Sequence, residues 1–143
     1  MVGIDLGARH IGVAVSDGTG TLASPRGTID RGRDDAEAWR ALAAVVEDVG
    51  ARCVVVGLPL SLDGRRGPAA RAAQADADEL ARVLAADGVR VETFDERLTT
   101  VSAARSLADA GTPRRRQRAR IDASAAAVLL QAWLDAGHGR GHG

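Results

Sequence analysis

Apolar residues in the first thirty positions form short segments with the two-residue alternation of β-strands. Three such segments occupy residues 2–7, 11–17 and 21–29, and turns rich in Gly and Asp separate them. The short gap between the first two predicts a β-hairpin. Pro25 lies in the third segment, and we expect that strand at a sheet edge or a bulge, because proline has no N–H to donate to a neighbouring strand.

From residue 34 onward, the apolar spacing alternates between helical and strand patterns. A helix is predicted from Asp34 to Gly50, because acids open it, apolar residues recur three or four positions apart, and a glycine ends it. Residues 52–57 and 89–94 have strand patterns, and the first is continuously apolar, as in strands buried on both faces. Three further helices are predicted, at about residues 68–87, 100–110 and 121–134.

This alternation of strands and helices predicts parallel strands joined by right-handed crossovers. Together with the opening hairpin, it predicts an α/β fold with one five-stranded mixed sheet and helices on both faces. We expect the strands in the order 3-2-1-4-5 across the sheet. Residues 1–137 would form this single domain, and the Gly- and His-rich residues 138–143 a flexible tail without core-forming side chains.

The composition is that of one ordinary domain. The chain has 143 residues, of which 45% are hydrophobic, enough for a single core. Only 2% are aromatic, which argues against the stacking platforms that hold bases in many single-strand-binding proteins. The 19 basic and 19 acidic residues cancel, so net charge identifies no partner. Every basic residue is arginine; GC-rich codon usage is the favoured explanation of this bias, although arginine also suits phosphate.

Nothing in the sequence predicts export or membrane insertion. The chain starts directly with a strand-like segment rather than a signal peptide, and no apolar stretch approaches the length that crosses a bilayer. The one cysteine, Cys53, lies in an apolar segment and cannot form an intrachain disulfide, as expected in a reducing compartment. We therefore expect a cytoplasmic protein with a buried thiol and no membrane partner.

Asp5 is the first candidate for chemistry, because it interrupts an apolar strand segment. Strand alternation puts it on one face with Gly3 and Gly7, and these small neighbours leave room for a ligand or another backbone. An ionised carboxylate in a central strand needs a partner, since burying an isolated charge is costly. A strand-end Asp bonded to local amides is the structural alternative, and we favour the functional interpretation.

Acidic residues also end the last predicted strand and open the last predicted helix. Asp95 and Glu96 lie at a strand end, where ligands bind in open α/β sheets, although either could instead cap the next helix. We favour Glu96 as the ligand because its side chain reaches further. Asp122 lies in a first helical turn, beside the apolar stripe; compensation of the helix dipole is its simpler role.

If Asp5, Glu96 and Asp122 converge, repulsion among them favours a bound divalent cation. Carboxylate oxygens without His or Cys partners select Mg²⁺ or Mn²⁺. Such ions activate water and stabilise the leaving oxygen in phosphodiester hydrolysis. The predicted metal ligands are therefore Asp5, Glu96 and Asp122, and Asp95 is added to them as a catalytic candidate.

A basic run directly precedes Asp122, and its arginines are predicted to contact nucleic-acid phosphates. Such contacts imply salt-sensitive binding with little sequence preference. A solvated linker is the alternative. A second, weaker candidate is the loop before residue 68, because a helix start can hold phosphate. The arginines of the two segments are Arg65, Arg66, Arg114, Arg115, Arg116, Arg118 and Arg120.

Five ordered motifs cover nearly the whole chain: Gly3-Ile4-Asp5-Leu6-Gly7, Ile11-Gly12-Val13-Ala14-Val15-Ser16-Asp17, Val55-Val56-Gly57-Leu58-Pro59-Leu60 with Asp63-Gly64, Asp95-Glu96-Arg97-Leu98-Thr99-Thr100, and Ile121-Asp122 with Ala125-Ala126 and Leu129-Leu130-Gln131. In order and spacing they resemble the YqgF/RuvX family of pre-16S rRNA nucleases and Holliday-junction resolvase relatives. The chain departs from the family in its abrupt start at Met1-Val2 and at Arg9-His10, and neither departure involves the acids.

The resemblance implies an RNase H-like fold and a role in trimming the 5′ end of pre-16S rRNA. It also implies an acidic metal site at Asp5, Glu96 (or Asp95) and Asp122, and a role for Arg97 in orienting a carboxylate or binding phosphate. The expected partner is nucleic acid, with pre-rRNA preferred over branched DNA, and the expected state is a monomer or a weak homodimer.

Three other functions compete with this interpretation. A Holliday-junction resolvase would use the same acids but needs two sites, hence a dimer. An ATPase related to actin and sugar kinases also begins with Asp-Leu-Gly before a hairpin, but it needs a duplicated domain that 143 residues cannot hold. A non-catalytic binding module is disfavoured because the acids are present.

Overall fold

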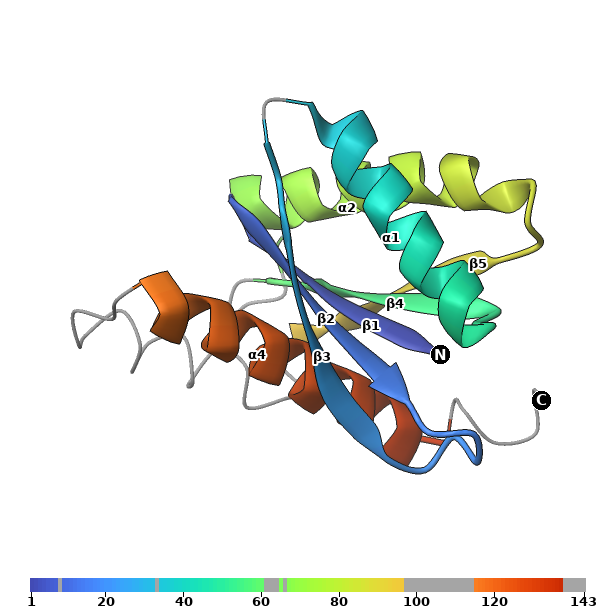
Figure 1. The fold of residues 1–143 in the computed structure, drawn as a ribbon. Coiled ribbons are helices and arrows are strands. Elements are labelled where there is room, and N and C mark those ends of the chain that lie inside the picture. Colours follow the sequence, from blue (N-terminus) through green and yellow to red (C-terminus); the bar gives the residue numbers. More distant parts are fainter. Residues whose placement is uncertain (8, 33, 61–64, 66, 97–114, 138–143) are drawn as a thin grey trace.

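The computed structural model describes residues 1–7, 9–32, 34–60, 65, 67–96 and 115–137, with side chains from residue 123 onward in the last segment. The predicted helix at 100–110 and the predicted tail at 138–143 lie outside the described residues. The described elements, in chain order, are β1 (Val2–Leu6), β2 (His10–Ser16), β3 (Ala23–Asp30), α1 (Asp35–Val49), β4 (Cys53–Leu58), α2 (Pro68–Ala85), β5 (Arg90–Asp95) and α4 (Arg115–Asp135) (Figure 1).

The five strands form one mixed sheet in the order β3-β2-β1-β4-β5, as predicted. The two hairpin pairings, β1 with β2 and β2 with β3, are antiparallel. The pairings of β1 with β4 and of β4 with β5 are parallel. Strand β1 is therefore central, and its carboxyl end lies at the same sheet edge as the carboxyl ends of β4 and β5.

Pro25 occupies an edge strand, as predicted, and it also lies next to a bulge. Val13 pairs with Gly27 and Ala14 pairs with Pro25, so Arg26 is the additional residue on β3. Gly27 has a φ of +149°, a value that side chains disfavour. The bulge lets β3 accommodate a proline without breaking the ladder on both sides of it.

Helices cover both faces of the sheet, α1 and α2 on one face and α4 on the other (Figure 1). Val2 and Ile4 of β1 point toward α1 and α2 and belong to the larger core cluster with Trp39 and Leu80. The opposite face carries a second cluster, in which Val55 of β4 packs with apolar residues of α4. Buried apolar side chains on alternating strand positions therefore hold three layers together.

Local sequence sets the ends of α1 as predicted. The Asp34 side chain accepts a hydrogen bond from the backbone N–H of Ala36, which caps the first turn (2.9 Å). Gly50 ends the helix with a φ of 67°, in the left-handed region that glycine adopts without strain. Burial of Cys53, 2% exposed, also agrees with the sequence-based expectation.

Helix α4 begins at Arg115, six residues before the predicted start at about residue 121. The prediction was wrong because it relied on the apolar stripe, which begins only at Ile121. Arginine, glutamine and alanine are good helix formers, and they continue the helix without any apolar face. The backbone of the basic run from Arg115 to Arg120 is therefore helical.

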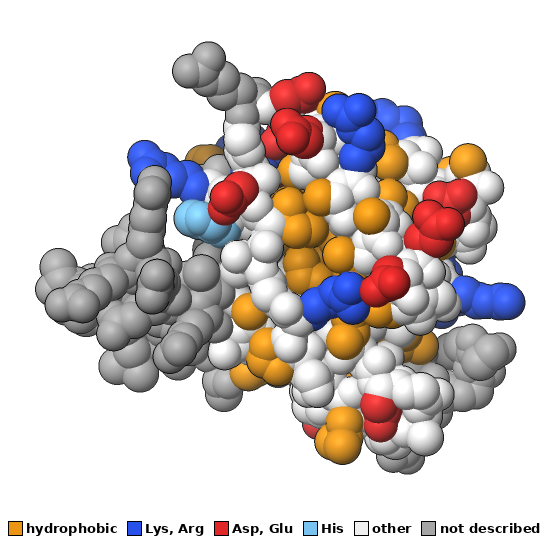
Figure 2. All heavy atoms as spheres, viewed as in Figure 1, with side chains coloured by type: hydrophobic (Ala, Val, Ile, Leu, Met, Phe, Trp, Pro, Cys, Tyr) orange, Lys and Arg blue, Asp and Glu red, His pale blue; other side chains and the backbone are white. Residues whose placement is uncertain are grey.

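The surface seen from the direction of Figure 1 mixes both signs of charge with apolar patches. Figure 2 shows acidic and basic side chains scattered around a band of hydrophobic ones. Exposed apolar residues in the described part of the chain include Leu22, Val49 and Val83. No helix in the described part combines the length and the apolar character needed to cross a bilayer.

Gly3→Ala tests how closely α4 approaches the sheet. A Cβ on Gly3 would lie 2.7 Å from the Cβ of Leu130 and 3.2 Å from the carbonyl oxygen of Ala126, so the helix would have to shift. We expect a loss of roughly 1–3 kcal/mol in unfolding free energy, measured by urea denaturation. The control is Gly18→Ala, since a Cβ on Gly18 meets nothing within 4 Å. Equal midpoints for the two variants would contradict the close packing.

Candidate functional site

Asp5 lies on the central strand and is almost completely buried, with 1% of the residue exposed. It lies on the face of the sheet that α4 covers, together with Gly3. Leu130 and Ala126 of α4 occupy the space where a side chain on Gly3 would lie. At Gly7 the backbone of β2 occupies this space instead, since a Cβ there would lie 2.6 Å from the carbonyl oxygen of His10. Both glycines therefore allow close approach of protein rather than leaving space for a ligand.

Glu96 follows β5 directly and is buried to a similar degree, with 2% exposed. Its side chain lies over Gly57 of β4: a Cβ on Gly57 would be 2.6 Å from Oε1 and 3.0 Å from Cγ of Glu96. The same Cβ would be 3.1 Å from Cδ2 of Leu129 on α4. Glu96 is therefore enclosed between β4 and α4, on the same face as Asp5.

The strand register brings the two carboxylates to the same level of the sheet. Ile4 pairs with Val56 in the parallel ladder, so the next position along each strand sets Asp5 beside Gly57. Adjacent strands are about 4.8 Å apart. Because Glu96 covers Gly57, the Asp5 and Glu96 side chains are neighbours at the carboxyl ends of the parallel strands. This is the convergence that the sequence predicted for these two acids.

Asp95 and Asp122, the other two acidic candidates, are placed less completely. Asp95 is half-buried and is the last residue of β5, where it pairs with Leu58 of β4. It directly precedes Glu96. Asp122 belongs to α4, in the turn that precedes Ala126, but its side chain lies outside the described residues. Ala126 packs on Gly3 of β1, and Asp122 lies one helical turn before Ala126.

Burial and charge act together on the Glu96 carboxyl. Burial, followed by the negative charge of Asp95, raises the pKa of Glu96 from 4.5 to about 7. Near neutral pH this group therefore exchanges readily between its protonated and ionised forms. A cation bound beside it would favour the ionised form, so the electrostatics of the Glu96 site suit a positively charged ligand.

The described donors fit a hard divalent cation. Carboxylate oxygens are the ligands that Mg²⁺ and Mn²⁺ prefer, and the missing side chain at Gly57 gives Glu96 its place beside Asp5. No group of three or more potential metal-binding side chains occurs among the described residues. The third predicted ligand, Asp122, is on the part of α4 whose side chains are not described.

The candidate phosphate-binding arginines fall mostly outside the described side chains. Arg65 is described and exposed. Arg66, Arg97 and Arg114 lie outside the described residues. The other arginines of the basic run occupy the first turns of α4, where only the backbone is described: Arg115, Arg116, Arg118 and Arg120.

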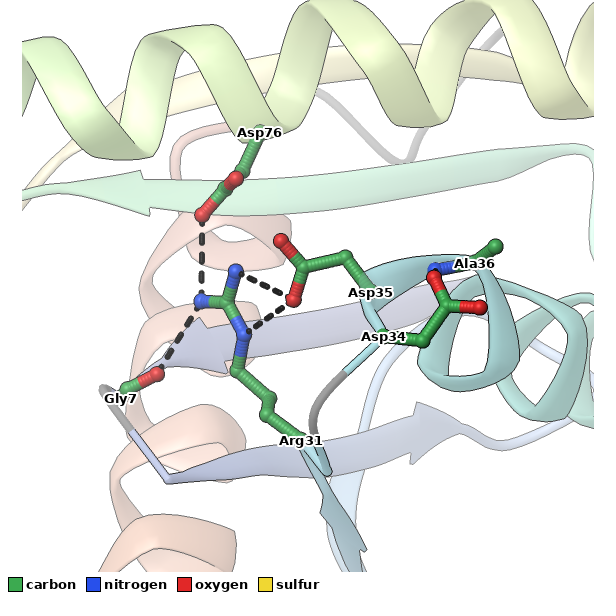
Figure 3. Close-up of polar contacts among 6 residues, drawn as sticks. All are labelled: Gly7, Arg31, Asp34, Asp35, Ala36 and Asp76. Carbon is green, nitrogen blue, oxygen red and sulfur yellow. Dashed lines mark hydrogen bonds and ion pairs between the residues drawn. The ribbon is translucent and has the colours of Figure 1, made fainter.

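The sequence alone did not assign a role in the site to Gly57 and Arg31, two residues that the structure places next to the acidic residues or their strands. Gly57 makes the space that Glu96 fills, and the available signal was a glycine inside a continuously apolar strand, which marks a close approach. Arg31 contacts the backbone two residues after Asp5, through Nη1 and the carbonyl oxygen of Gly7 (3.1 Å) (Figure 3). Its position after a strand carries no comparable sequence signal.

Comparison with known proteins gives one consistent result. The family model described as "RuvX: Holliday junction resolvase" matches residues 1–136. A protein of Myxococcus xanthus is 48% identical over 135 residues, covering 94% of this chain and 87% of its own length. One of Anaeromyxobacter is 44% identical over 137 residues, covering 96% and 97%. Both relatives carry the provisional name of pre-16S rRNA nuclease.

Solved structures agree on the fold. RuvC of Thermus thermophilus in complex with a Holliday junction substrate is 18% identical, with a TM-score of 0.57, and the match covers 96% of this chain and 94% of RuvC. A second structure of Thermus thermophilus RuvC gives a TM-score of 0.52 at 19% identity. The fold is therefore the RNase H-like one that the sequence predicted.

The raised pKa of Glu96 predicts how stability depends on pH. Between about pH 4.5 and 7 the folded protein holds a proton on Glu96 that the unfolded chain has released, so stability falls as pH rises through this window. Glu96→Gln removes this effect. In metal-free buffer and between about pH 5 and 8, we expect the free energy of unfolding of the variant to exceed that of wild type by roughly 1–3 kcal/mol, measured by urea denaturation.

The control for this comparison is Glu37→Gln, which alters an exposed carboxylate on α1. It should keep the wild-type fall in stability between about pH 4.5 and 7, because Glu96 is unchanged. A Glu96→Gln curve that runs parallel to the wild-type curve would show that the Glu96 carboxyl titrates normally in the folded protein.

Proposed function

Because this chain belongs to the RuvX family, we propose that it is a divalent-metal-dependent nuclease that hydrolyses phosphodiester bonds during maturation of the 5′ end of pre-16S rRNA. The observation that carries the proposal is the pair of buried carboxylates, Asp5 and Glu96, side by side at the carboxyl ends of parallel strands. A buried pair of acids is costly unless protons or cations compensate the charge, and a catalytic metal site supplies that compensation.

In the proposed site, Asp5, Glu96 and Asp122 hold Mg²⁺ or Mn²⁺, and Asp95 supports Glu96 from the strand end. A cation held there would supply an activated water and neutralise charge on the phosphate. Asp5 contributes a ligand fixed by the central strand, and Glu96 a ligand enclosed by Gly57 and Leu129. Such enclosure keeps the carboxylates oriented and limits the water around them.

The arginines of the chain would hold the nucleic acid across this site. We propose that the arginines of the first turns of α4, with Arg97 and Arg114 before them, contact phosphates. Arg65 and Arg66, which precede α2, would contact a second part of the backbone. Binding through phosphates alone is salt-sensitive and reads shape rather than sequence, which suits a structured RNA.

RNA is the favoured substrate because the relatives at 44–48% identity are named for pre-16S rRNA. A Holliday-junction resolvase is the second candidate, favoured by the description of the family model. The two differ in assembly, since a resolvase cuts two strands symmetrically and needs paired active sites, whereas a monomer or weak homodimer suffices for the rRNA.

Cleavage of a structured pre-16S rRNA fragment and of a synthetic four-way junction, in parallel reactions with Mn²⁺, separates the candidates. We expect the RNA to be cut at low protein concentration and the junction to be cut poorly. Symmetric cleavage of the junction in preference to the RNA, by a protein that sizes as a dimer, would overturn the rRNA assignment.

Asp5→Asn tests the catalytic assignment directly. The amide keeps the shape of the side chain but removes its charge, so Mn²⁺-dependent cleavage should fall by at least about 100-fold while RNA binding without metal is retained. Gel-based cleavage and filter binding measure the two effects. The matched control is Asp48→Asn, an exposed acid on α1, which should cleave normally. Equal activity of Asp5→Asn and wild type would remove Asp5 from the mechanism.

Gly57→Ala tests the placement of Glu96. The added methyl group would meet Oε1 of Glu96 at 2.6 Å and displace this flexible side chain. We expect Mn²⁺ binding, followed by the EPR signal of the free ion, to weaken by about 10-fold. Gly18→Ala adds the same group in open space and should bind as wild type. Unchanged affinity in Gly57→Ala would separate Glu96 from the metal.

A further inference from the structure

A second polar cluster lies on the side of the sheet that α1 and α2 cover, and Arg31 is its centre (Figure 3). The Arg31 side chain is only 13% exposed. Its Nε and Nη2 donate to Oδ1 of Asp35 in the first turn of α1 (3.2 and 3.1 Å). Its Nη1 forms an ion pair with Oδ2 of Asp76 on α2 (3.1 Å). One guanidinium therefore connects the end of β3 to both helices of this layer.

The same guanidinium also holds the chain that follows β1. Nη1 of Arg31 donates to the carbonyl oxygen of Gly7 at 3.1 Å. The guanidinium carbon also lies 5.4 Å from the centre of the Trp39 ring, which favours a cation. These contacts fix the plane of the guanidinium from several sides, so its position is defined by α1, α2 and the core rather than by solvent.

Gly7 is held at both ends of its backbone. Its N–H donates to the carbonyl oxygen of His10 (2.9 Å), and its own carbonyl oxygen accepts from Arg31. The backbone N–H of Arg31 donates in turn to the carbonyl oxygen of Arg9 (2.8 Å), which closes the β1–β2 turn from the outside. A Cβ at residue 7 would lie 2.6 Å from the carbonyl oxygen of His10, so Gly7 packs closely against the start of β2.

Asp5 lies only two residues before this fixed point, about 6.6 Å along an extended strand. From the geometry we infer that Arg31 is a positioning residue for Asp5: by linking the Gly7 carbonyl oxygen to the carboxylates of Asp35 and Asp76, its guanidinium keeps the Asp5 carboxylate in register with Glu96. This inference rests on the proposed function, because it concerns the metal site. Metal ligands must be held within about 0.5 Å of their working geometry, so a contact that fixes the backbone next to Asp5 should affect metal binding.

Arg31→Gln is the principal test, and Arg26→Gln is its matched control. Arg26 also joins β3 to α1, through Nη2 and Oδ2 of Asp48 (2.8 Å), but no contact recorded for it reaches Gly7. We expect Arg31→Gln to weaken Mn²⁺ binding about 10-fold in the full chain and to speed amide exchange at Gly7 in the metal-free protein. Arg26→Gln should do neither, although both variants lose some stability.

Two further variants keep the test decisive. Arg31→Lys keeps the charge but not the planar fork, so it should recover only part of the Mn²⁺ affinity. Asp76→Asn, which removes one support of the guanidinium, should weaken binding by about threefold, and it decides the matter if Arg31→Gln fails to fold. Wild-type Mn²⁺ affinity in folded Arg31→Gln, with stability alone reduced, would overturn the positioning role.

The failure of this inference can be told apart from failure of the proposed function. If Asp5→Asn loses Mn²⁺ binding while Arg31→Gln keeps it, the metal site stands and only the role of Arg31 is wrong. If Asp5→Asn binds Mn²⁺ as wild type does, the metal site itself is wrong.

Discussion

The close contact between α4 and the sheet is the constraint on which the rest of the structure depends. Gly3 allows the helix to approach β1 so nearly that one additional carbon atom would collide with Leu130. This approach packs α4 against the face of the sheet that carries Asp5 and Glu96, and both acids are at most 2% exposed.

The two faces of β1 have different roles: one packs into the hydrophobic core, and the other carries Asp5. Val2 and Ile4 pack under α1 and α2 in the larger of the core clusters. Asp5 faces the smaller cluster under α4. Because strand alternation separates the two sets of side chains, the acidic site can carry a high energetic cost while the opposite face of the same strand supplies stability.

Much of the fold could be predicted from the sequence because its signals are local. The hairpin, the edge position of Pro25 and the limits of α1 follow from spacing, the missing N–H of proline and capping residues. The start of α4 could not be found this way, since its first turns have no apolar face to mark them. Periodicity detects burial, and it is silent where a helix is polar on all sides.

The candidate site was predictable in its acids but not in their supports. Asp5 and Glu96 are visible as charges at strand positions, and the structure brings these two together. Asp122 stays a prediction. Gly57 and Arg31 depend on contacts between distant segments: Glu96 over β4, and a guanidinium between two helices and a turn. No spacing rule encodes such contacts, because they arise only when the layers assemble.

The irregular edge at β3 limits how copies of this chain could associate. A regular outer strand offers a row of unpaired N–H and carbonyl groups to which a foreign strand can add. Pro25 lacks the N–H, and the extra residue Arg26 breaks the repeat, so the row on β3 is interrupted at its middle. Backbone pairing of two molecules across the β3 edge is therefore disfavoured, which leaves β5, the other edge strand, as the border of the sheet where a foreign strand could add.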